Sequence, residues 1–184
     1  MLTKPWEQPE SPWKTEGAFW SWLRGGLRLG LWNKNPIKLQ FIKDNRKRIK
    51  NPRPNPSVNR AMVWGGTCAL CRTDCVQQDL EVDHIHGNHS LRTFEDVIYF
   101  VQNIAFVTAK DLQLVCKSCH KAKSYSEKTG IDFEAARIEK QAIAITKTID
   151  TTLAYLNEQN YNGPMPSNAK KRRDLVRELL QNKE

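Results

Sequence analysis

Two C-x-x-C pairs constrain this chain more than any other feature of its sequence. Cys68 and Cys71 form the first pair, Cys116 and Cys119 form the second, and 44 residues lie between them. A two-residue gap lets both thiolates of a pair face one ion, and two pairs complete a tetrahedral site. Four thiolates leave no open coordination position, so the sequence predicts a structural Zn²⁺ site. The alternative is two unrelated pairs of buried thiols.

The fifth cysteine, Cys75, is expected to be a free thiol, although it could instead replace Cys71 as a zinc ligand. The chain has no apolar run long enough to span a bilayer, and its first residues form no apolar signal core. We therefore expect a cytoplasmic protein, in the host cell if a phage encodes it. In a reducing compartment, clustered cysteines hold metal more often than they form disulfides.

The net charge of +9 lies entirely in the first third of the sequence. Residues 1–60 carry thirteen Lys/Arg and four Asp/Glu, whereas residues 61–184 carry sixteen of each. This excess favours a polyanionic partner, with double-stranded DNA as the first candidate and an anionic membrane surface as the second. The residues expected to contact DNA phosphates form the densest basic run: Arg46, Lys47, Arg48 and Lys50.

Residues 1–60 also hold five of the six tryptophans. Thr15 is positioned to cap a helix that runs to about Trp32, and the Gly25-Gly26 pair would weaken or break that helix. Its aromatic residues could pack into the core, stack on unpaired bases or lie on a membrane surface. Three alternate prolines in residues 51–56 predict a stiff, extended connector.

The segment between the cysteine pairs contains a predicted strand, residues 80–85, followed by Gly-Asn turn chemistry. Asp83 and His84 lie near the end of that strand. Adjacent strand residues point to opposite faces, so these side chains can share one site only if the strand ends or bulges there. Beyond the second pair, the sequence Cys119-His120-Lys121 is expected at the start of a helix.

The order of these elements resembles the HNH nucleases, which have a ββα-metal active site. The first cysteine pair is followed by Val82-Asp83-His84-Ile85, and then by Asp111-Leu112-Gln113-Leu114-Val115, which leads into the second pair and His120. The resemblance covers residues 68 to 124, under a third of the chain. Residues 82–88 also resemble phage homing endonucleases of this family, which carry separate DNA-binding arms.

The resemblance implies a role for each motif residue. His84 would be the general base that takes a proton from the attacking water, and Asp83 would be the carboxylate that holds a catalytic divalent ion. His120 would be the second ligand of that ion, for which Mg²⁺ or Mn²⁺ fits this pair better than zinc. Lys121 and Lys123 are expected to contact phosphate near the cut. The products would carry 5′-phosphate and 3′-hydroxyl ends.

The sequence departs from the family at one position, because Asp111 stands where the family usually has an Asn that orients the base histidine. An Asp can accept the imidazole N–H and hold the ring, as in a Ser-His-Asp triad, but it also adds negative charge near a phosphate. Asn103 or Asn88 could take the role instead. His86 and His89 are expected to be plain loop residues, with His89 as a spare metal ligand in the alternative.

The C-terminal region is expected to be helical. Residues 132–160 are predicted to form one long helix because apolar residues recur at three- and four-residue steps. That stripe could pack on its own domain or form a coiled-coil seam, and we favour a monomer over a homodimer. The basic residues 170–173 are expected to form a mobile tail that adds DNA affinity, followed by a short helix over residues 174–181.

These observations predict an α+β protein with three parts: a basic, Trp-rich DNA-binding arm over residues 1–60, a zinc-stabilised nuclease core over 61–130, and a helical region over 131–184. The expected function is a divalent-metal-dependent HNH-type DNA endonuclease, of phage homing type, that nicks or cuts both strands. Two alternatives are a non-catalytic zinc-containing DNA-binding protein and a membrane-surface interaction module.

Overall fold

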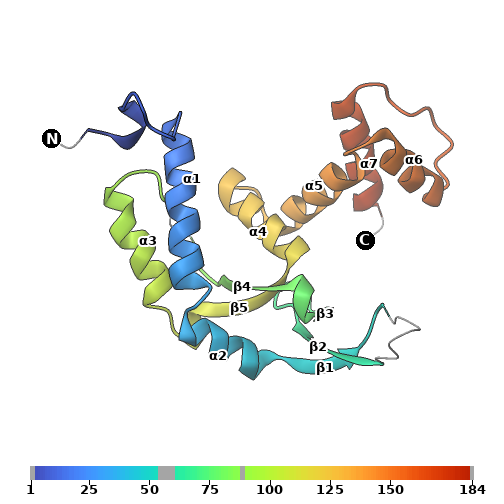
Figure 1. The fold of residues 1–184 in the computed structure, drawn as a ribbon. Helices are drawn as coiled ribbons and strands as arrows, with labels where there is room; N and C mark the ends of the chain where they lie inside the picture. The colour runs from blue at the N-terminus through green and yellow to red at the C-terminus, as the bar shows by residue number, and fades with distance from the viewer. Residues whose placement is uncertain (1–2, 54–60, 88–89, 183–184) are drawn as a thin grey trace. The chain divides into compact units, whose positions relative to one another are not determined.

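The computed structural model describes residues 3–53, 61–87 and 90–182 (Figure 1). It confirms the expected α+β class. The chain forms two compact units, Met1–Val115 and Cys116–Glu184, and each is described here by itself. Asn88, His89 and the prolines at positions 54 and 56 lie outside the described residues.

The first unit contains helices and two small sheets. Its helices are α1 (Glu16–Leu27), α2 (Pro36–Asn45) and α3 (Glu95–Ala105). Its strands are β1 (Lys47–Lys50), β2 (Met62–Thr67), β3 (Asp74–Val76), β4 (Leu80–His84) and β5 (Leu112–Cys116), the last of which ends one residue into the second unit. The second unit contains α4 (Lys117–Thr129), α5 (Phe133–Ile145), α6 (Ile149–Glu158) and α7 (Ala169–Gln181).

Helix α1 begins where the sequence predicts. The Thr15 hydroxyl accepts a hydrogen bond from the Ala18 N–H at 3.2 Å, which satisfies one of the N–H groups left open at the start of the helix. The expected break at Gly25-Gly26 does not occur, because α1 runs through both glycines to Leu27. The irregularity comes later, where the chain continues as a π-helical turn, Arg28–Trp32.

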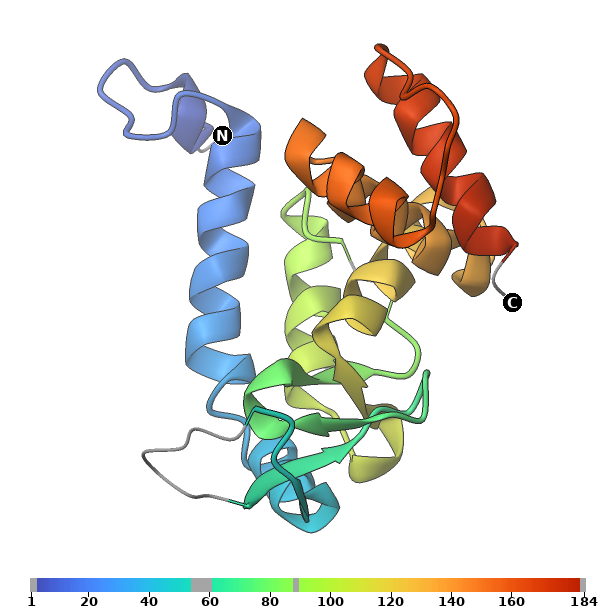
Figure 2. The same cartoon turned by 90° about the vertical axis from the view of Figure 1, so that its right-hand side faces the viewer.

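The aromatic residues of the N-terminal segment form a core with α3. Figures 1 and 2 show α1 alongside α3, and the buried side chains between them are Phe19, Trp20, Leu91, Phe100 and Ile104. Trp6, Trp13 and Trp32 pack against this group. Core packing is therefore the role of most of these aromatics, although Trp22 is 56% exposed.

A three-stranded antiparallel sheet has the order β1-β2-β3. The antiparallel pairing of β1 with β2 continues one residue past β1, because the Asn51 N–H donates to the Ala61 carbonyl at 2.9 Å. Gly65 in β2 permits a close approach, because a Cβ there would collide with the Cys75 carbonyl and with Ile49. The glycine is therefore needed to bring β1, β2 and β3 together.

The second sheet pairs β4 with β5. The Ile85 N–H donates to the Asp111 carbonyl at 2.8 Å, so the end of β4 lies beside the start of β5. One face of this pair is buried in a second core, formed by Val82, Val107, Leu112 and Leu114. The predicted strand over residues 80–85 is thereby confirmed, and it positions Asp83 and His84 at the end of β4.

The prediction of one long helix over residues 132–160 is wrong. The chain forms α5 and α6, separated by residues 146–148. Thr148 ends the helical run because its hydroxyl accepts the Thr151 N–H at 3.2 Å, while the Thr151 hydroxyl accepts the Thr148 N–H in return. The apolar residues of this segment also differ in burial, since Ile138 is buried whereas Ile149 is 53% exposed. A continuous coiled-coil seam is therefore not formed.

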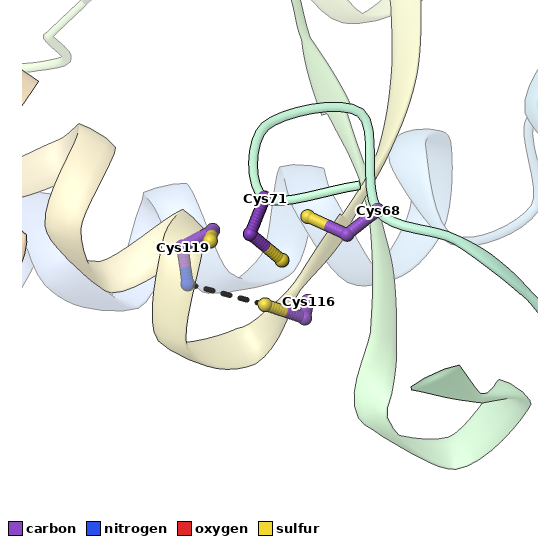
Figure 3. A group of neighbouring side chains, drawn as sticks. All are labelled: Cys68, Cys71, Cys116 and Cys119. Carbon is purple, nitrogen blue, oxygen red and sulfur yellow. Dashed lines mark hydrogen bonds between the residues drawn. The ribbon is translucent and has the colours of Figure 1, made fainter. Parts of the chain in front are cut away.

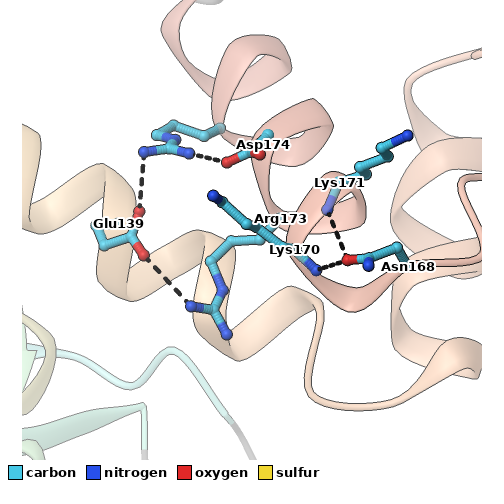
Figure 4. Close-up of polar contacts among 7 residues, drawn as sticks. Glu139, Asn168, Lys170, Lys171, Arg173 and Asp174 are labelled. Atoms are coloured by element: carbon cyan, nitrogen blue, oxygen red, sulfur yellow. Dashed lines mark hydrogen bonds and ion pairs between the residues drawn. The ribbon is translucent and has the colours of Figure 1, made fainter.

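The prediction of a mobile basic tail is also wrong. Residues 170–173 belong to α7, which begins at Ala169 rather than at Asp174, with Asn168 as its cap (Figure 4). Glu139 of α5 lies 3.7 Å from Arg173 and 3.6 Å from Arg177 of α7. The fully buried side chain of Val176 completes the packing of this helix. The predicted short helix over residues 174–181 is therefore the C-terminal part of a longer helix, which Asn168 caps.

Asn35 links the cap of α2 to α3. Its side-chain oxygen accepts from the Ile37 and Lys38 N–H groups, and its amide nitrogen donates to the Ile104 carbonyl at 2.9 Å, while the residue is only 7% exposed. We expect Asn35→Ala to lower the unfolding free energy by about 2–3 kcal/mol, since it removes a cap and leaves a buried carbonyl without its partner. Urea denaturation measures this.

The control is Asn168→Ala, which removes an exposed Asn cap from α7 and should cost only about 1 kcal/mol. Equal losses in the two variants would contradict the role assigned to the Asn35 amide nitrogen.

Candidate functional site

The four predicted cysteine ligands come together in one cluster. Cys68 follows β2 directly, and Cys71 lies in the turn after it. Cys116 is the last residue of β5 and the N-cap of α4, whose first turn contains Cys119. In Figure 3 the four side chains point toward one another, and their sulfur atoms all lie within 4.8 Å of one another.

This geometry fits a tetrahedral metal site. In a zinc site with four sulfur ligands, bonds of about 2.3 Å place the sulfurs about 3.8 Å apart, which agrees with the cluster. Main-chain N–H groups also support the thiolates, since the Cys119 N–H donates to the Cys116 sulfur at 3.5 Å. Three of the four residues are buried and Cys71 is exposed. The four cysteines could therefore hold a metal ion such as zinc.

The turn that carries the first cysteine pair is tied to β5 and to itself by main-chain hydrogen bonds. The Ala69 N–H donates to the Leu114 carbonyl at 2.7 Å, and the Cys68 N–H donates to the Thr73 carbonyl at 2.9 Å. Arg72 takes a left-handed backbone conformation with φ of 61°, which closes the turn. Cys75 lies farther along, in β3, and is not a member of the cluster.

His84 is held on two sides, by Asn103, which the sequence offered as an orienting residue, and by Trp32, which it did not. Its Nε2 lies 2.9 Å from the main-chain carbonyl oxygen of Asn103, near the end of α3. Its ring stacks on that of Trp32, with centroids 4.6 Å apart and planes at 24°. Lys38 lies over the same indole at 4.7 Å, and burial lowers the pKa of this lysine, an effect that Glu81 partly offsets. The imidazole therefore has a defined orientation.

Asp83 and His84 make their contacts on opposite sides of β4. The Asp83 carboxylate accepts a hydrogen bond from the Gln113 side chain of β5 at 3.3 Å. His84 lies instead against Trp32, which also packs on the core that contains Val82. The strand ends at His84, as a shared site requires, yet the alternation of side chains continues to this last residue.

Asp111 is used in the turn before β5. Its carboxylate accepts the Thr108 N–H at 2.7 Å and the Thr108 hydroxyl at 2.8 Å. These hydrogen bonds hold the pKa of Asp111 below its usual range, and the charge of His84 lowers that pKa further. The electrostatic effect of His84 indicates that the two groups are close. The expected orienting role of Asp111 stays a prediction, as Asn103 contacts the ring through its backbone carbonyl.

The remaining predicted residues lie on other elements. His120 and the exposed Lys121 are in α4, where the helix starts at Lys117 as the sequence indicates. Lys123 is paired with Glu127 at 3.0 Å. His86 is exposed just after β4. The basic run is structured, because Arg46 caps the end of α2 and the next residues form β1.

Sequence reasoning missed Trp32, Gln113 and Trp64 as partners of the predicted residues. Trp64 lies opposite Arg48 in the β1–β2 register, and Trp32 lies 52 positions before His84 in the sequence. No local pattern reports such contacts. The alternation of β2 was the one available signal, since it puts Trp64 on the face of the sheet that carries Arg48.

Comparisons of the chain with protein-family models, with curated proteins and with solved structures find no match. Within the described ranges, no helix is long and apolar enough to cross a membrane.

We expect each chain to bind one zinc ion and to depend on it for folding. The double variant Cys68→Ser/Cys116→Ser should lose the metal, and its unfolding free energy should fall by more than about 4 kcal/mol, because the metal-binding energy contributes directly to folding. Plasma mass spectrometry and thermal unfolding measure the two effects. Cys75→Ser is the control and should keep both properties. A double variant that retains full zinc content would contradict this assignment.

The Asp111 carboxylate should stabilise the fold in a pH-dependent way. Its pKa is lowered in the folded state, so its stabilisation is fully present above the unfolded pKa of about 3.9 and is lost as the pH falls through the folded value. Asp111→Ala should therefore have a lower Tm than the parent at neutral pH, and the difference should shrink below pH about 4. Calorimetry at several pH values measures it. A difference that grows in acid would exclude this explanation.

Proposed function

We propose that the protein is a divalent-metal-dependent DNA endonuclease of the HNH type, built around a four-cysteine zinc site. The observation that carries the proposal is the environment of His84, whose ring is fixed by the Asn103 carbonyl and Trp32 at the end of β4. The order of motifs supports it, because β4 with Asp83-His84 pairs with β5, and the cysteine pair and His120 follow at the start of α4.

The contact with Asn103 decides which nitrogen of His84 is basic. A carbonyl oxygen only accepts hydrogen bonds, so Nε2 carries the proton, and Nδ1 is the basic nitrogen of the neutral ring. A neutral imidazole is a suitable base near pH 7, where it takes a proton from water as the water attacks phosphorus. The stacked indole of Trp32 then favours the imidazolium ion, because the face of an indole attracts a cation.

Asp83 and His120 are the proposed ligands of the catalytic Mg²⁺ or Mn²⁺. A bound divalent ion would supply Lewis acidity, neutralising charge on the phosphate and on the leaving 3′ oxygen. The Gln113 side chain holds the Asp83 carboxylate from the neighbouring strand at 3.3 Å, which limits its rotation. Asp83 would then present its oxygens in one direction, as a hard cation requires.

The opposite contacts of Asp83 and His84 determine how the substrate would lie. A phosphodiester would cross the end of β4, with its phosphate oxygens toward Asp83 and the attacking water toward His84. Beyond His84, the exposed residues Ile85 and His86 form a bend after β4, and the Ile85 N–H still donates to the Asp111 carbonyl. This arrangement lets two side chains on opposite faces serve one phosphate.

A nuclease core without activity is the second candidate, and the hydrogen bonds of Asp111 favour it. The carboxylate is occupied by Thr108, and it adds negative charge close to His84. Charge of that sign raises the cost of bringing a phosphate to the site. A zinc-containing protein that binds DNA but does not cut it is therefore the alternative that experiment must separate from the nuclease.

His84→Ala should lower the rate of plasmid relaxation with Mg²⁺ by at least about 10²-fold, which is the usual contribution of a general base, and should leave DNA binding nearly unchanged. Gel analysis of nicked and linear product measures the rate, with EDTA as the metal-free reference. His86→Ala removes an exposed histidine two residues away and is the matched control.

A His84→Ala protein that cuts at the parent rate would contradict the proposed base. A parent protein that shifts DNA in a gel, and leaves both plasmid and DNA from its own genomic neighbourhood intact with Mg²⁺ and Mn²⁺, would establish the binding-only alternative.

A further inference from the structure

One face of the hairpin formed by β1 and β2 carries cations around an exposed tryptophan. Arg48 is directly opposite Trp64 in the register, and Lys50 is opposite Met62. Arg46 precedes β1 in an extended conformation, so its side chain belongs to the same face. Trp64 is 43% exposed and Met62 is 42% exposed. The face therefore combines three exposed cations with an accessible indole.

The indole of Trp64 holds two of these cations in place. The guanidinium of Arg46 lies 4.4 Å from the ring centroid, and that of Arg48 lies 5.3 Å from it. Arg48 also donates to the Met62 carbonyl at 2.8 Å. A stacked guanidinium keeps its N–H edges directed outward, and it loses less rotamer freedom when it binds a phosphate. Trp64 thus preorganises the arginines.

Among the described residues, two further cations close to this face in the sequence are already paired. Lys47 points to the other face of β1 and lies 2.7 Å from Asp74, whose pKa is lowered mainly by that contact. Arg53 lies 2.8 Å from Asp79. The alternation of side chains along β1 therefore separates the basic run into two groups. Arg46, Arg48 and Lys50 lie on one face, and Lys47, whose charge is neutralised by Asp74, lies on the other.

We infer that Arg46, Arg48, Lys50 and Trp64 form a docking face for the phosphate backbone of double-stranded DNA, and that Lys47 takes no part. The inference rests on the proposed function for the nature of its ligand. It adds the binding surface and names Trp64 as the residue that positions the arginines.

Duplex DNA is the partner that the geometry favours. The three cations recur at every second residue, about 6.7 Å apart along the strand, so they form a row that can follow a chain of phosphates. Arg46, Arg48 and Lys50 are all exposed, so this row is accessible from solvent. Two guanidinium groups already lie against the indole of Trp64, which leaves less of its surface for stacking on an unpaired base.

The test is the salt dependence of duplex binding, measured by fluorescence anisotropy in EDTA so that cleavage does not interfere. The triple variant Arg46→Gln/Arg48→Gln/Lys50→Gln should lower the slope of log K against log salt by about 2–3, because each phosphate contact contributes about 0.9. Trp64→Leu should weaken binding about five- to tenfold with an unchanged slope, since it removes cation–π support but no charge.

Two controls match these variants. Lys47→Gln/Asp74→Asn removes an ion pair from the other face without changing net charge, and it should bind with the parent slope. Trp22→Leu removes an exposed indole from α1, 56% accessible, and it should bind with the parent affinity. Circular dichroism and the Tm verify that each variant is folded.

If the triple variant has the same slope of log K against log salt as the parent, the inference is wrong. The cations would then serve only to prevent pairing of the edge strand with another chain. Loss of single-strand but not duplex binding in Trp64→Leu would overturn the positioning role in favour of base stacking. Binding of anionic vesicles that is lost in the triple variant, with duplex binding intact, would assign the face to a membrane surface.

These outcomes are separable from the proposed catalysis. If the variants show the expected slopes but the parent never cuts DNA, the docking face is supported and the nuclease proposal is wrong. If the parent cuts DNA but the triple variant binds DNA like the parent, the nuclease proposal is supported and the docking face is wrong.

Discussion

Four cysteine sulfur atoms that converge within 4.8 Å, and that could hold a metal ion, impose the strictest requirement on this chain. Thiolates at that distance repel one another, and a shared cation removes the repulsion. Meeting the requirement fixes the turn after β2, the end of β5 and the first turn of α4, since each of them carries part of the cluster. Small cores supply little stability of their own, and a metal ion held by this cluster would add to it.

The residues of the proposed active site depend on this framework indirectly, through β5. β5 reaches the cluster at Cys116, and its other end lies beside β4 through the hydrogen bond from Ile85 to Asp111. His84 then meets Trp32 and Asn103, which come from the α1–α3 part of the same unit. The aromatic N-terminal segment therefore supports the proposed base directly, in addition to carrying basic residues. An arm that only bound DNA would leave the imidazole without its contact with Trp32.

Local signals were sufficient for several elements. Thr15 caps α1 through its own hydroxyl, β4 follows the apolar run of residues 80–85, and α4 begins at the second cysteine pair. The prediction of one helix over residues 132–160 was wrong because apolar spacing indicates only which face of a helix is apolar. It does not register a capping pair such as Thr148 and Thr151, which ends one helix and begins the next. The prediction of a mobile tail over residues 170–173 was wrong for a related reason. Glu139 pairs with Arg173, and Asn168 caps the helix that contains these residues, and both partners lie outside the basic run.

The sequence by itself determined the four cysteine ligands, the α+β class and the position of Asp83-His84 at a strand end, because each depends on residue type and short spacing. Only the tertiary structure decided which nitrogen of His84 is basic, what holds Asp111, and which cations of the basic run are available. Those properties depend on side chains that are distant in sequence, such as Asn103 for His84 and Asp74 for Lys47. Electrostatic and hydrogen-bonding partners act through space over a few ångströms, so the fold assigns them.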